Sequence, residues 1–211
     1  MASTRTQPEE EVSVELSSQE KAVLDEMIKD AKNSCLSEET VNKCRAMIAE
    51  NEEQNTTAVS GISPVIALGG TLKNQTNGTL TVHDSKLWAG IIVKKYPDPL
   101  DRIGLFAQGC VWYKGIKAAV VYTGENSAGV ECGWLLAWAD SKTKGRKIYA
   151  KCGRKSDFDC IDWGHKKDKL KKALPVVRAH DSNTGTSVYA TIFGVESAVS
   201  TEDAVVGVFT G

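Results

Sequence analysis

The sequence predicts a mainly β protein, an antiparallel β-sandwich formed by residues 55–211 with an N-terminal α-helical hairpin packed on it. Before residue 54, apolar side chains recur at helical spacing in two segments. After that point β-branched and aromatic residues come in short runs, and glycine, proline and asparagine mark frequent turns between them. Many short strands with few helical stretches are typical of a sandwich. The 211 residues, of which 41% are hydrophobic, suffice for one substantial domain.

The N-terminal part divides into a tail and two helices. Residues 1–16 are polar and acidic and are predicted to be a disordered tail. Residues 17–54 are predicted to form the helical hairpin. Ser17 and Glu20 form a capping box at the start of its first helix, and the second helix follows Ser37 with acidic residues in its first turn. The short connector predicts an antiparallel arrangement.

The β region contains ten candidate strands and one further helix. The helix is predicted over 165–174, where Pro175 limits its C-terminal end. The strands are predicted at 62–68, 79–83, 89–94, 103–113, 117–123, 132–139, 146–152, 175–180, 186–194 and 204–210.

The segment VECGWLLAWAD, residues 130–140, is apolar on both faces if it is extended. Strands of this kind have both faces covered. One face therefore packs against the partner sheet, and the small outer face at Ala137 and Ala139 suits a helix laid flat on it. We expect the helical hairpin, which has two apolar stripes to bury, to be that cover.

Charge is unevenly distributed along the chain. The net charge is −1, so the whole molecule has no strong field toward nucleic acid, and no nucleic-acid partner is predicted. Residues 1–54 carry about −7 and the remainder about +6, with the basic excess concentrated in 142–172. Either packing complementarity or an acidic cover over an anion site explains this division. No apolar run is long enough for a transmembrane segment.

The N-terminus lacks the apolar core of a secretory signal, which predicts a cytoplasmic or nuclear protein. In that compartment the six cysteines are expected to be reduced thiols. No pair has metal-ligand spacing, and neither a metal site nor a cofactor is predicted. The cysteines are Cys35, Cys44, Cys110, Cys132, Cys152 and Cys160.

A series of motifs between residues 60 and 155 resembles the plant 23-kDa jasmonate-induced proteins. The motifs are Trp88 with Gly90, Tyr96-Pro97, Gly104 with Phe106 and Ala107, Ala119 to Tyr122, and Cys132 through Trp138. The resemblance implies a hormone- or stress-responsive plant protein on a β-sandwich, similar in outline to aegerolysins and actinoporins. It carries no catalytic set with it. Relatives often have histidine where this chain has Ala89.

Three residues are candidates for catalysis: Asp140, His83 and Asp84. Asp140 ends the tryptophan strand beside Trp138, where partial desolvation of its carboxylate would raise the pKa and suit proton transfer or a cationic ligand. His83-Asp84 and His180-Asp181 each end a predicted strand, and the two pairs would form a proton-transfer site if they met at one end of the sandwich. Neighbours on a strand point to opposite faces, so neither pair is a dyad by itself. The alternative is that these are solvated turn residues.

Four aromatic residues are candidates for ligand binding: Trp88, Trp138, Tyr96 and Trp112. Trp134 is predicted to be core. Trp112 with Tyr113 lies at a strand end and is a plausible rim.

Three functions remain open from the sequence. The first is a stress-responsive binding protein that holds a small apolar plant metabolite or lipid, or a partner, in a pocket of the sandwich. The second is a cofactor-free cyclase or isomerase of specialised metabolism, which uses a carboxylate in an apolar pocket. The third is an aegerolysin-like protein that binds membrane lipid through an aromatic rim and the basic stretch 142–147. The oligomeric state is open.

Overall fold

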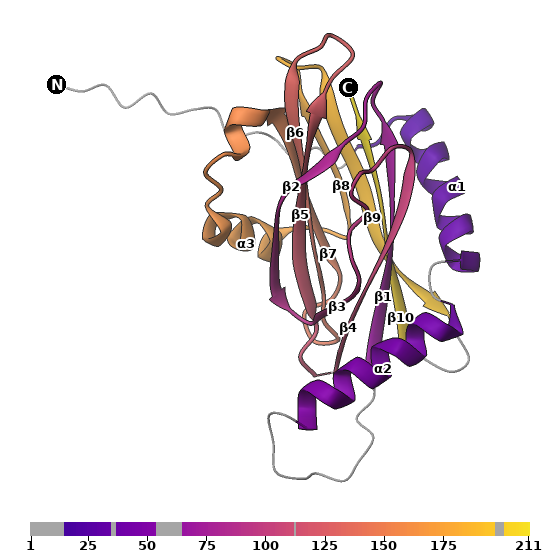
Figure 1. The fold of residues 1–211 in the computed structure, drawn as a ribbon. Coiled ribbons are helices and arrows are strands. Elements are labelled where there is room, and N and C mark those ends of the chain that lie inside the picture. The colour runs from indigo at the N-terminus through magenta and orange to yellow at the C-terminus, as the bar shows by residue number, and fades with distance from the viewer. Residues whose placement is uncertain (1–14, 35–36, 54–64, 112, 197–200) are drawn as a thin grey trace, which may run out of the picture.

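The described part of the protein is a two-layer β-sandwich with three α-helices, which confirms the predicted mainly β sandwich with a pair of N-terminal helices packed on it (Figure 1). The computed structural model describes residues 15–34, 37–53, 65–111, 113–196 and 201–211. The larger sheet has six strands in the order β3-β4-β1-β10-β9-β8, and the smaller has four in the order β2-β5-β6-β7. Within the described ranges no helix is long and apolar enough to cross a membrane.

The smaller sheet is antiparallel and has the tryptophan strand near its centre. It consists of β2 (Thr81–Ala89), β5 (Ile116–Glu125), β6 (Glu131–Asp140) and β7 (Lys147–Arg154). Trp134 is paired with Tyr122 on one side and Cys152 on the other, and Asp140 at the end of β6 is paired with Ile116 at the start of β5. This register places Asp140 at one end of the sandwich, next to the β6–β7 turn.

The larger sheet contains strands from both the beginning and the end of the β region. It consists of β3 (Ile91–Lys94), β4 (Ile103–Val111), β1 (Val65–Gln75), β10 (Thr201–Thr210), β9 (Thr186–Glu196) and β8 (Val176–Asp181). The pair β1–β10 is parallel. β1 extends beyond the strand predicted at 62–68 and stays paired with β4 and β10 through Gly69-Gly70. Glycine at position 70 makes room for the Phe106 ring, because a Cβ there would lie 1.9 Å from Cε1 of Phe106.

The layer between the sheets is filled by side chains from both of them. Trp134 and Trp138 are fully buried there. The Trp138 ring lies 4.9 Å from the Phe106 ring and 5.8 Å from the Tyr96 ring, centroid to centroid. Its indole Nε1 donates to Oε1 of Gln108 at 2.8 Å, and Nε2 of Gln108 donates to the Tyr96 hydroxyl at 3.0 Å. This pairing satisfies the buried amide, which would otherwise be costly in an apolar core.

The outer face of the tryptophan strand is covered by the segment that follows β7, and the expectation that the N-terminal helices cover it is wrong. The cover consists of the short 3₁₀ helix η1 (Lys155–Phe158) and α3 (Trp163–Lys172). Phe158 and Leu170 are buried against Leu135, Ala137 and Ala139. Glycine at position 133 allows the Phe158 ring to approach β6 closely, because a Cβ there would lie 2.3 Å from the ring.

The two N-terminal helices, α1 (Ser18–Ser34) and α2 (Glu38–Glu53), pack on the outer face of the larger sheet instead. They bury their stripes in two separate clusters, and Figure 1 shows α1 running along the strands while α2 crosses one end of the sheet, so they do not form the predicted antiparallel hairpin. α2 lies close to β4 at Gly109, where a Cβ would be 1.9 Å from Sγ of Cys44.

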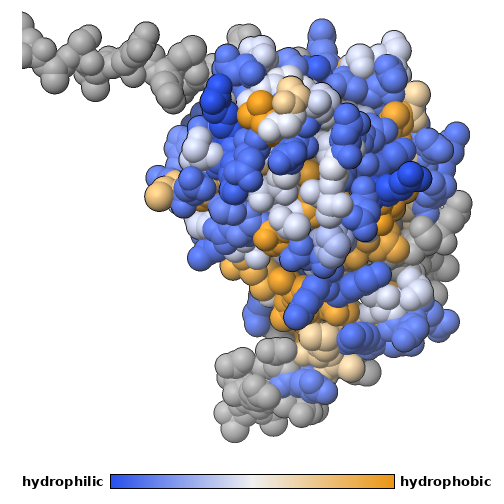
Figure 2. Space-filling model, turned by 45° about the horizontal axis from the view of Figure 1, so that its top comes forward, coloured by the Kyte–Doolittle hydropathy of each residue, from blue (hydrophilic) through white to orange (hydrophobic). Residues whose placement is uncertain are grey.

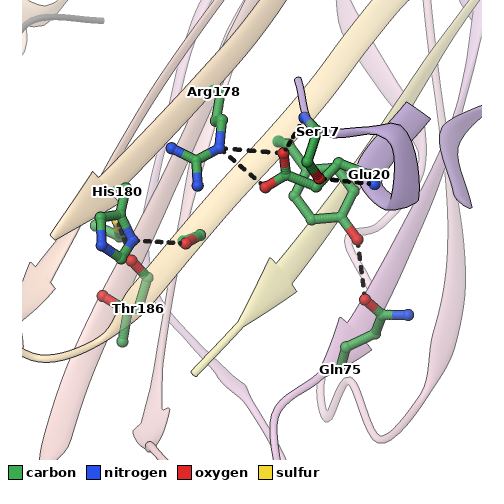
Figure 3. Close-up of polar contacts among 9 residues, drawn as sticks. Ser17, Glu20, Gln75, Arg178, His180 and Thr186 are labelled. Carbon is green, nitrogen blue, oxygen red and sulfur yellow. Dashed lines mark hydrogen bonds and ion pairs between the residues drawn. The ribbon is translucent and has the colours of Figure 1, made fainter. Parts of the chain in front are cut away.

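The predicted capping box is confirmed, and it also anchors α1 to the sheet (Figure 3). The backbone N–H of Ser17 donates to Oε2 of Glu20 at 2.8 Å, and the Glu20 N–H donates to Oγ of Ser17 at 3.2 Å. Nε of Arg178 on β8 donates to both Glu20 oxygens at 2.9 and 3.1 Å. The cap and the ion pair hold the pKa of Glu20 below its ordinary value, against the opposing effect of burial. One carboxylate thus begins the helix and holds it on β8.

Several predictions concern residues outside the described ranges. They include Cys35, Trp112 and nearly all of the tail predicted at 1–16. Among the described residues, no disulfide joins Cys44, Cys110, Cys132, Cys152 or Cys160.

Candidate functional site

A cavity of about 600 Å³ lies at the end of the sandwich where β6 ends, and its lining is strongly basic. We call it the lysine cavity. Apolar side chains of Ala89, Ile116, Ala139 and Leu170 form part of its wall. Asp140 is the single carboxylate among the described residues that line it. The lysines of the lining are Lys114, Lys117, Lys144, Lys147 and Lys171.

The five lysines come from five different parts of the chain. Lys117 is on β5, Lys147 on β7 and Lys171 on α3, while Lys114 and Lys144 lie in the β4–β5 and β6–β7 turns. Lys147 Nζ donates to the Lys171 carbonyl at 2.5 Å, which joins α3 to the edge of the cavity. Burial, followed by the charges of Lys167, Lys144 and Lys171, lowers the pKa of Lys117. The neighbouring ammonium groups therefore add to the effect of burial on Lys117.

A second cavity of about 470 Å³ lies on the other side of the β6–β7 turn and contains a pair of carboxyl groups. Asp140 of β6 lines this cavity as well, together with Asp203 of β10. Both side chains are buried, and they are hydrogen-bonded to one another. Arg146 in the turn pairs with Asp203, with Nε and a terminal guanidinium nitrogen each 2.5 Å from Oδ1.

Asp140 has an altered acidity that follows from this arrangement. Burial, then the hydrogen bond to Asp203 and the charge of Asp203, raise the pKa of Asp140 to about 7. Arg146 and the Ser141 N–H act in the opposite direction. Because Arg146 bonds directly to Asp203, the proton that the two carboxyl groups can share belongs to Asp140. Asp140 therefore changes its charge near neutral pH.

The predicted partner of Asp140 is not at this site. Trp138 is fully buried between the sheets, bonded to Gln108, and lines neither cavity. Tyr96 packs against Trp138 and belongs to the same interior layer. Trp134 is core, with its Nε1 donating to the Thr210 carbonyl at 3.1 Å.

The structure does not bring His83 and Asp84 to Asp140. Asp84 lies opposite Val121, which lies opposite Leu135. Leu135 is five residues from Asp140 along β6, so at ~3.3 Å per residue the separation is about 17 Å. His83 sits at a bulge of β2, with Nε2 4.0 Å from Oδ1 of Asp159.

The remaining candidates have structural partners. Trp88 is half-buried on the outer face of the smaller sheet, edge-on to Trp163 at 5.8 Å. Nδ1 of His180 is 2.9 Å from Oγ of Ser187, on a neighbouring strand (Figure 3). Asp181 accepts hydrogen bonds within its own turn, from Asn183 and Thr184. In the described part of the chain no three His, Cys, Asp or Glu side chains converge as they would around a metal ion.

Sequence reasoning identified Asp140 but missed most of its surroundings. Asp203 precedes the apolar run of the last strand, and Lys117 interrupts the apolar run of β5. A charged residue at such a position is the signal that could have pointed to a buried polar site. Arg146 and Lys144 belong in sequence to the basic stretch 142–147, which shows no sign of the buried carboxylate beside it. Nothing in the sequence places Lys171 beside them.

Replacement of Asp140 by asparagine is expected to stabilise the protein at alkaline pH. A carboxyl group whose pKa is raised on folding favours the folded state below that pKa, and this contribution is lost as the pH rises from about 4 through about 7. Above pH 7 the folded protein carries a buried charge that Asp140→Asn removes. We expect a gain of about 2–4 kcal/mol in the free energy of unfolding at pH 8 and little change near pH 4.5.

Urea unfolding at both pH values measures this difference, and Asp25→Asn, on the exposed side of α1, is the control. Equal effects of Asp140→Asn at the two pH values would contradict the assignment.

Comparisons with known proteins agree with the architecture. No protein-family model matches the chain. The crystal structure of the lipid binding protein Nakanori matches it with a TM-score of 0.53 at 11% sequence identity, covering 81% of this chain and 80% of that one. At this identity the match shows a shared fold.

One relative has a higher sequence identity to this chain than Nakanori has. A jasmonate-induced protein homolog from Atriplex canescens is 32% identical over 170 residues, which represent 77% of this chain and 86% of that protein. The similarity agrees with the motif resemblance described above. The chain therefore belongs to the family of jasmonate-induced proteins.

Proposed function

We propose that the protein is a stress-responsive binding protein whose ligand is an anionic amphiphile, a molecule with a negatively charged head and an apolar part, held at the lysine cavity. The single observation that carries this proposal is the convergence of five lysines on a cavity of about 600 Å³ that also has an apolar wall. Ammonium groups are compact cationic donors suited to phosphate, sulfate and carboxylate groups.

The shape of the site suits a ligand with two chemically different parts. The lysines would hold the head, and Ala89, Ile116 and Leu170 offer contacts to the apolar part. The layer between the sheets is filled by tryptophan and other large side chains, so an entirely apolar ligand between the sheets has less support than it had from sequence alone.

Two exposed hydrophobic residues at the same end support a lipid as the source of the head. Tyr113 lines the lysine cavity and is 59% exposed, and Leu174, whose carbonyl accepts from Ile148 at the start of β7, is 55% exposed. Apolar side chains beside lysines are typical of surfaces that contact anionic lipid. Figure 2 brings the opposite end forward and shows mostly hydrophilic residues there, with hydrophobic residues in small groups. That Nakanori, of similar fold, is a lipid binding protein is consistent with this proposal.

Three probes distinguish the sources of the anionic group. They are phosphatidylcholine vesicles with and without phosphatidylglycerol, monomeric octyl sulfate, and inorganic sulfate. We expect binding to phosphatidylglycerol vesicles and to octyl sulfate, with affinity falling at higher ionic strength, and much weaker binding of sulfate. Preference for octyl sulfate over vesicles would indicate a soluble metabolite as the ligand.

Removal of two cavity charges is expected to weaken binding about thirtyfold, because each lysine near an anionic surface contributes about 1 kcal/mol. The variant is Lys144→Ala/Lys171→Ala, and calorimetry or vesicle sedimentation measures the loss. The matched control is Lys29→Ala/Lys43→Ala, which removes the same charge from exposed positions on α1 and α2. Equal losses in the two double variants would mean that only net charge matters, and unchanged binding in both would overturn the proposal.

A second candidate function, cofactor-free acid–base catalysis, is favoured by the buried Asp140–Asp203 pair. The cavity of about 470 Å³ that contains the pair has an apolar wall formed by Ile66, Pro175, Ile192 and Phe193. A carboxyl group that titrates near neutral pH in such a site is suited to proton transfer. Mass spectrometry of a plant metabolite extract incubated with the native protein or with Asp140→Asn tests it. Turnover by the native protein alone would favour catalysis, and identical extracts would exclude it for the metabolites present.

A further inference from the structure

Asp140 stands between the two cavities described above. Asp140 is among the residues that line each of them, and in the second cavity it lies with Asp203. Ser141 and Gly145, at the two ends of the β6–β7 turn, likewise line both cavities. An anion bound among the lysines would therefore lie near Asp140, where two charges in a partly buried region affect one another.

The carboxyl pair is built so that one proton is easily gained or lost. Asp140 is 6% exposed and Asp203 is 2% exposed, so water screens neither charge effectively. Arg146 is the guanidinium near both carboxyl groups, and its hydrogen bonds go to Asp203. Two buried carboxylates in hydrogen-bonding contact with one such partner are unstable when both are ionised.

Several of the elements packed around Asp140 contribute charged or titratable groups, while β1 and β9 contribute apolar residues. Besides the five lysines of the lysine cavity, these groups are Asp203 of β10, Arg146 and Lys142 of the β6–β7 turn, Cys110 of β4 and Tyr113 of the β4–β5 turn. Burial, together with the negative charge of Asp140, raises the pKa of Cys110 to about 12, so this thiol stays neutral in the physiological range. Lysine, arginine and tyrosine ordinarily titrate well above neutrality.

We propose that anion binding in the lysine cavity is coupled to the uptake of one proton by the Asp140–Asp203 pair. The inference rests on the proposed function, because it concerns the same cavity. A bound anion adds negative charge beside Asp140 and favours its neutral form. By linkage, protonation of Asp140 removes the only carboxylate among the described lining residues and strengthens anion binding to the same extent.

The direction and size of the effect follow from electrostatics. Affinity for an anion rises as the pH falls through neutrality. For charges several ångströms apart in a partly buried site the coupling is about tenfold in affinity. The coupling would release an anionic ligand in an alkaline compartment and retain it in an acidic one.

Octyl sulfate is the main probe, because its sulfate ester does not titrate in the range studied and any bound proton belongs to the protein. Calorimetry at about pH 7 in buffers of different ionisation enthalpy gives the number of protons taken up per ligand bound. Dissociation constants are measured between about pH 5.5 and pH 8, and vesicles that contain phosphatidylglycerol repeat the series for a lipid surface. We expect an uptake of up to one proton and an affinity about tenfold higher at the acidic end.

Two variants separate Asp140 from other titrating groups. Asp140→Asn is expected to abolish the proton uptake and to bind octyl sulfate at pH 8 about tenfold more tightly than the native protein does. His165→Gln is the matched control, because histidine ordinarily titrates in this range and His165 lies on α3, which contributes Leu170 and Lys171 to the cavity. The control is expected to keep both the uptake and the pH dependence.

The outcomes keep this inference distinct from the proposed function. Binding that is lost in Lys144→Ala/Lys171→Ala but takes up no proton would overturn the coupling and leave the anion site in place. The same pH dependence in Asp140→Asn as in the native protein, or its loss in His165→Gln, would also overturn the coupling. Absence of binding by every probe at every pH would overturn the proposed function and the inference with it.

Discussion

Trp138→Ala is expected to lower the free energy of unfolding by about 3–5 kcal/mol. The indole is fully buried between the sheets and packs against the rings of Phe106 and Tyr96. Its removal creates a large cavity and also takes the hydrogen-bond donor from Oε1 of Gln108, which is 0% exposed. Urea unfolding followed by circular dichroism measures the loss.

Two further variants divide this loss into its parts. Trp138→Phe keeps much of the ring volume but removes the donor. We expect it to lower the free energy of unfolding by about 1–3 kcal/mol, which is the cost of leaving the buried Gln108 amide oxygen without a partner. Trp88→Ala removes an indole that is only half-buried, against Trp163, and should cost less than Trp138→Ala. If Trp138→Ala destabilised the protein by less than Trp88→Ala, Trp138 would not have the core position described here.

Deletion of residues 1–54 is expected to produce an insoluble or unfolded protein. α1 and α2 bury the outer face of the larger sheet in two clusters, and without them these apolar side chains would face water. A continuous apolar surface of this kind leads to aggregation. The sheet residues concerned are Ala67, Val93, Ala107, Val111, Tyr189, Val206 and Val208. Soluble yield and the melting temperature of the fragment measure the effect.

A deletion of residues 1–14 alone is the control, because it leaves α1, its cap at Ser17 and the Glu20–Arg178 ion pair in place. It should melt close to the full chain. A soluble 55–211 fragment with an unchanged melting temperature would show that the helices are dispensable and that the sheet face needs no cover.

Replacement of Asp140 distinguishes the two functions proposed for its carboxyl group, which are the tuning of anion affinity and proton transfer to a substrate. If Asp140 tunes anion affinity, its replacement by asparagine leaves a binding protein with altered pH dependence. If Asp140 transfers protons to a substrate, the same replacement ends turnover. The lysine double variant acts in the opposite manner, because it weakens ligand binding while the carboxyl pair in the second cavity keeps its partners.

The sequence by itself determined the features that depend on local pattern. The alternation of strands and turns, the capping box of Ser17 and Glu20, and the apolar faces of β6 all follow from neighbours within a few residues. The family could also be identified from the order of its motifs, and the desolvation of Asp140 could be expected at the end of an apolar strand.

Only the tertiary structure decided which partners those elements meet. The apolar outer face of β6 required a cover, but any amphipathic helix could supply one, and the nearest in sequence after β7 did so through η1 and α3. Gly69-Gly70 has the pattern of a turn, yet pairing with β4 and β10 on its two sides makes it part of a strand. Asp203 is 63 residues from Asp140, and no short-range pattern joins them. Their contact exists because β10 and β6 lie in facing sheets, where burial and mutual repulsion then set the charge of Asp140.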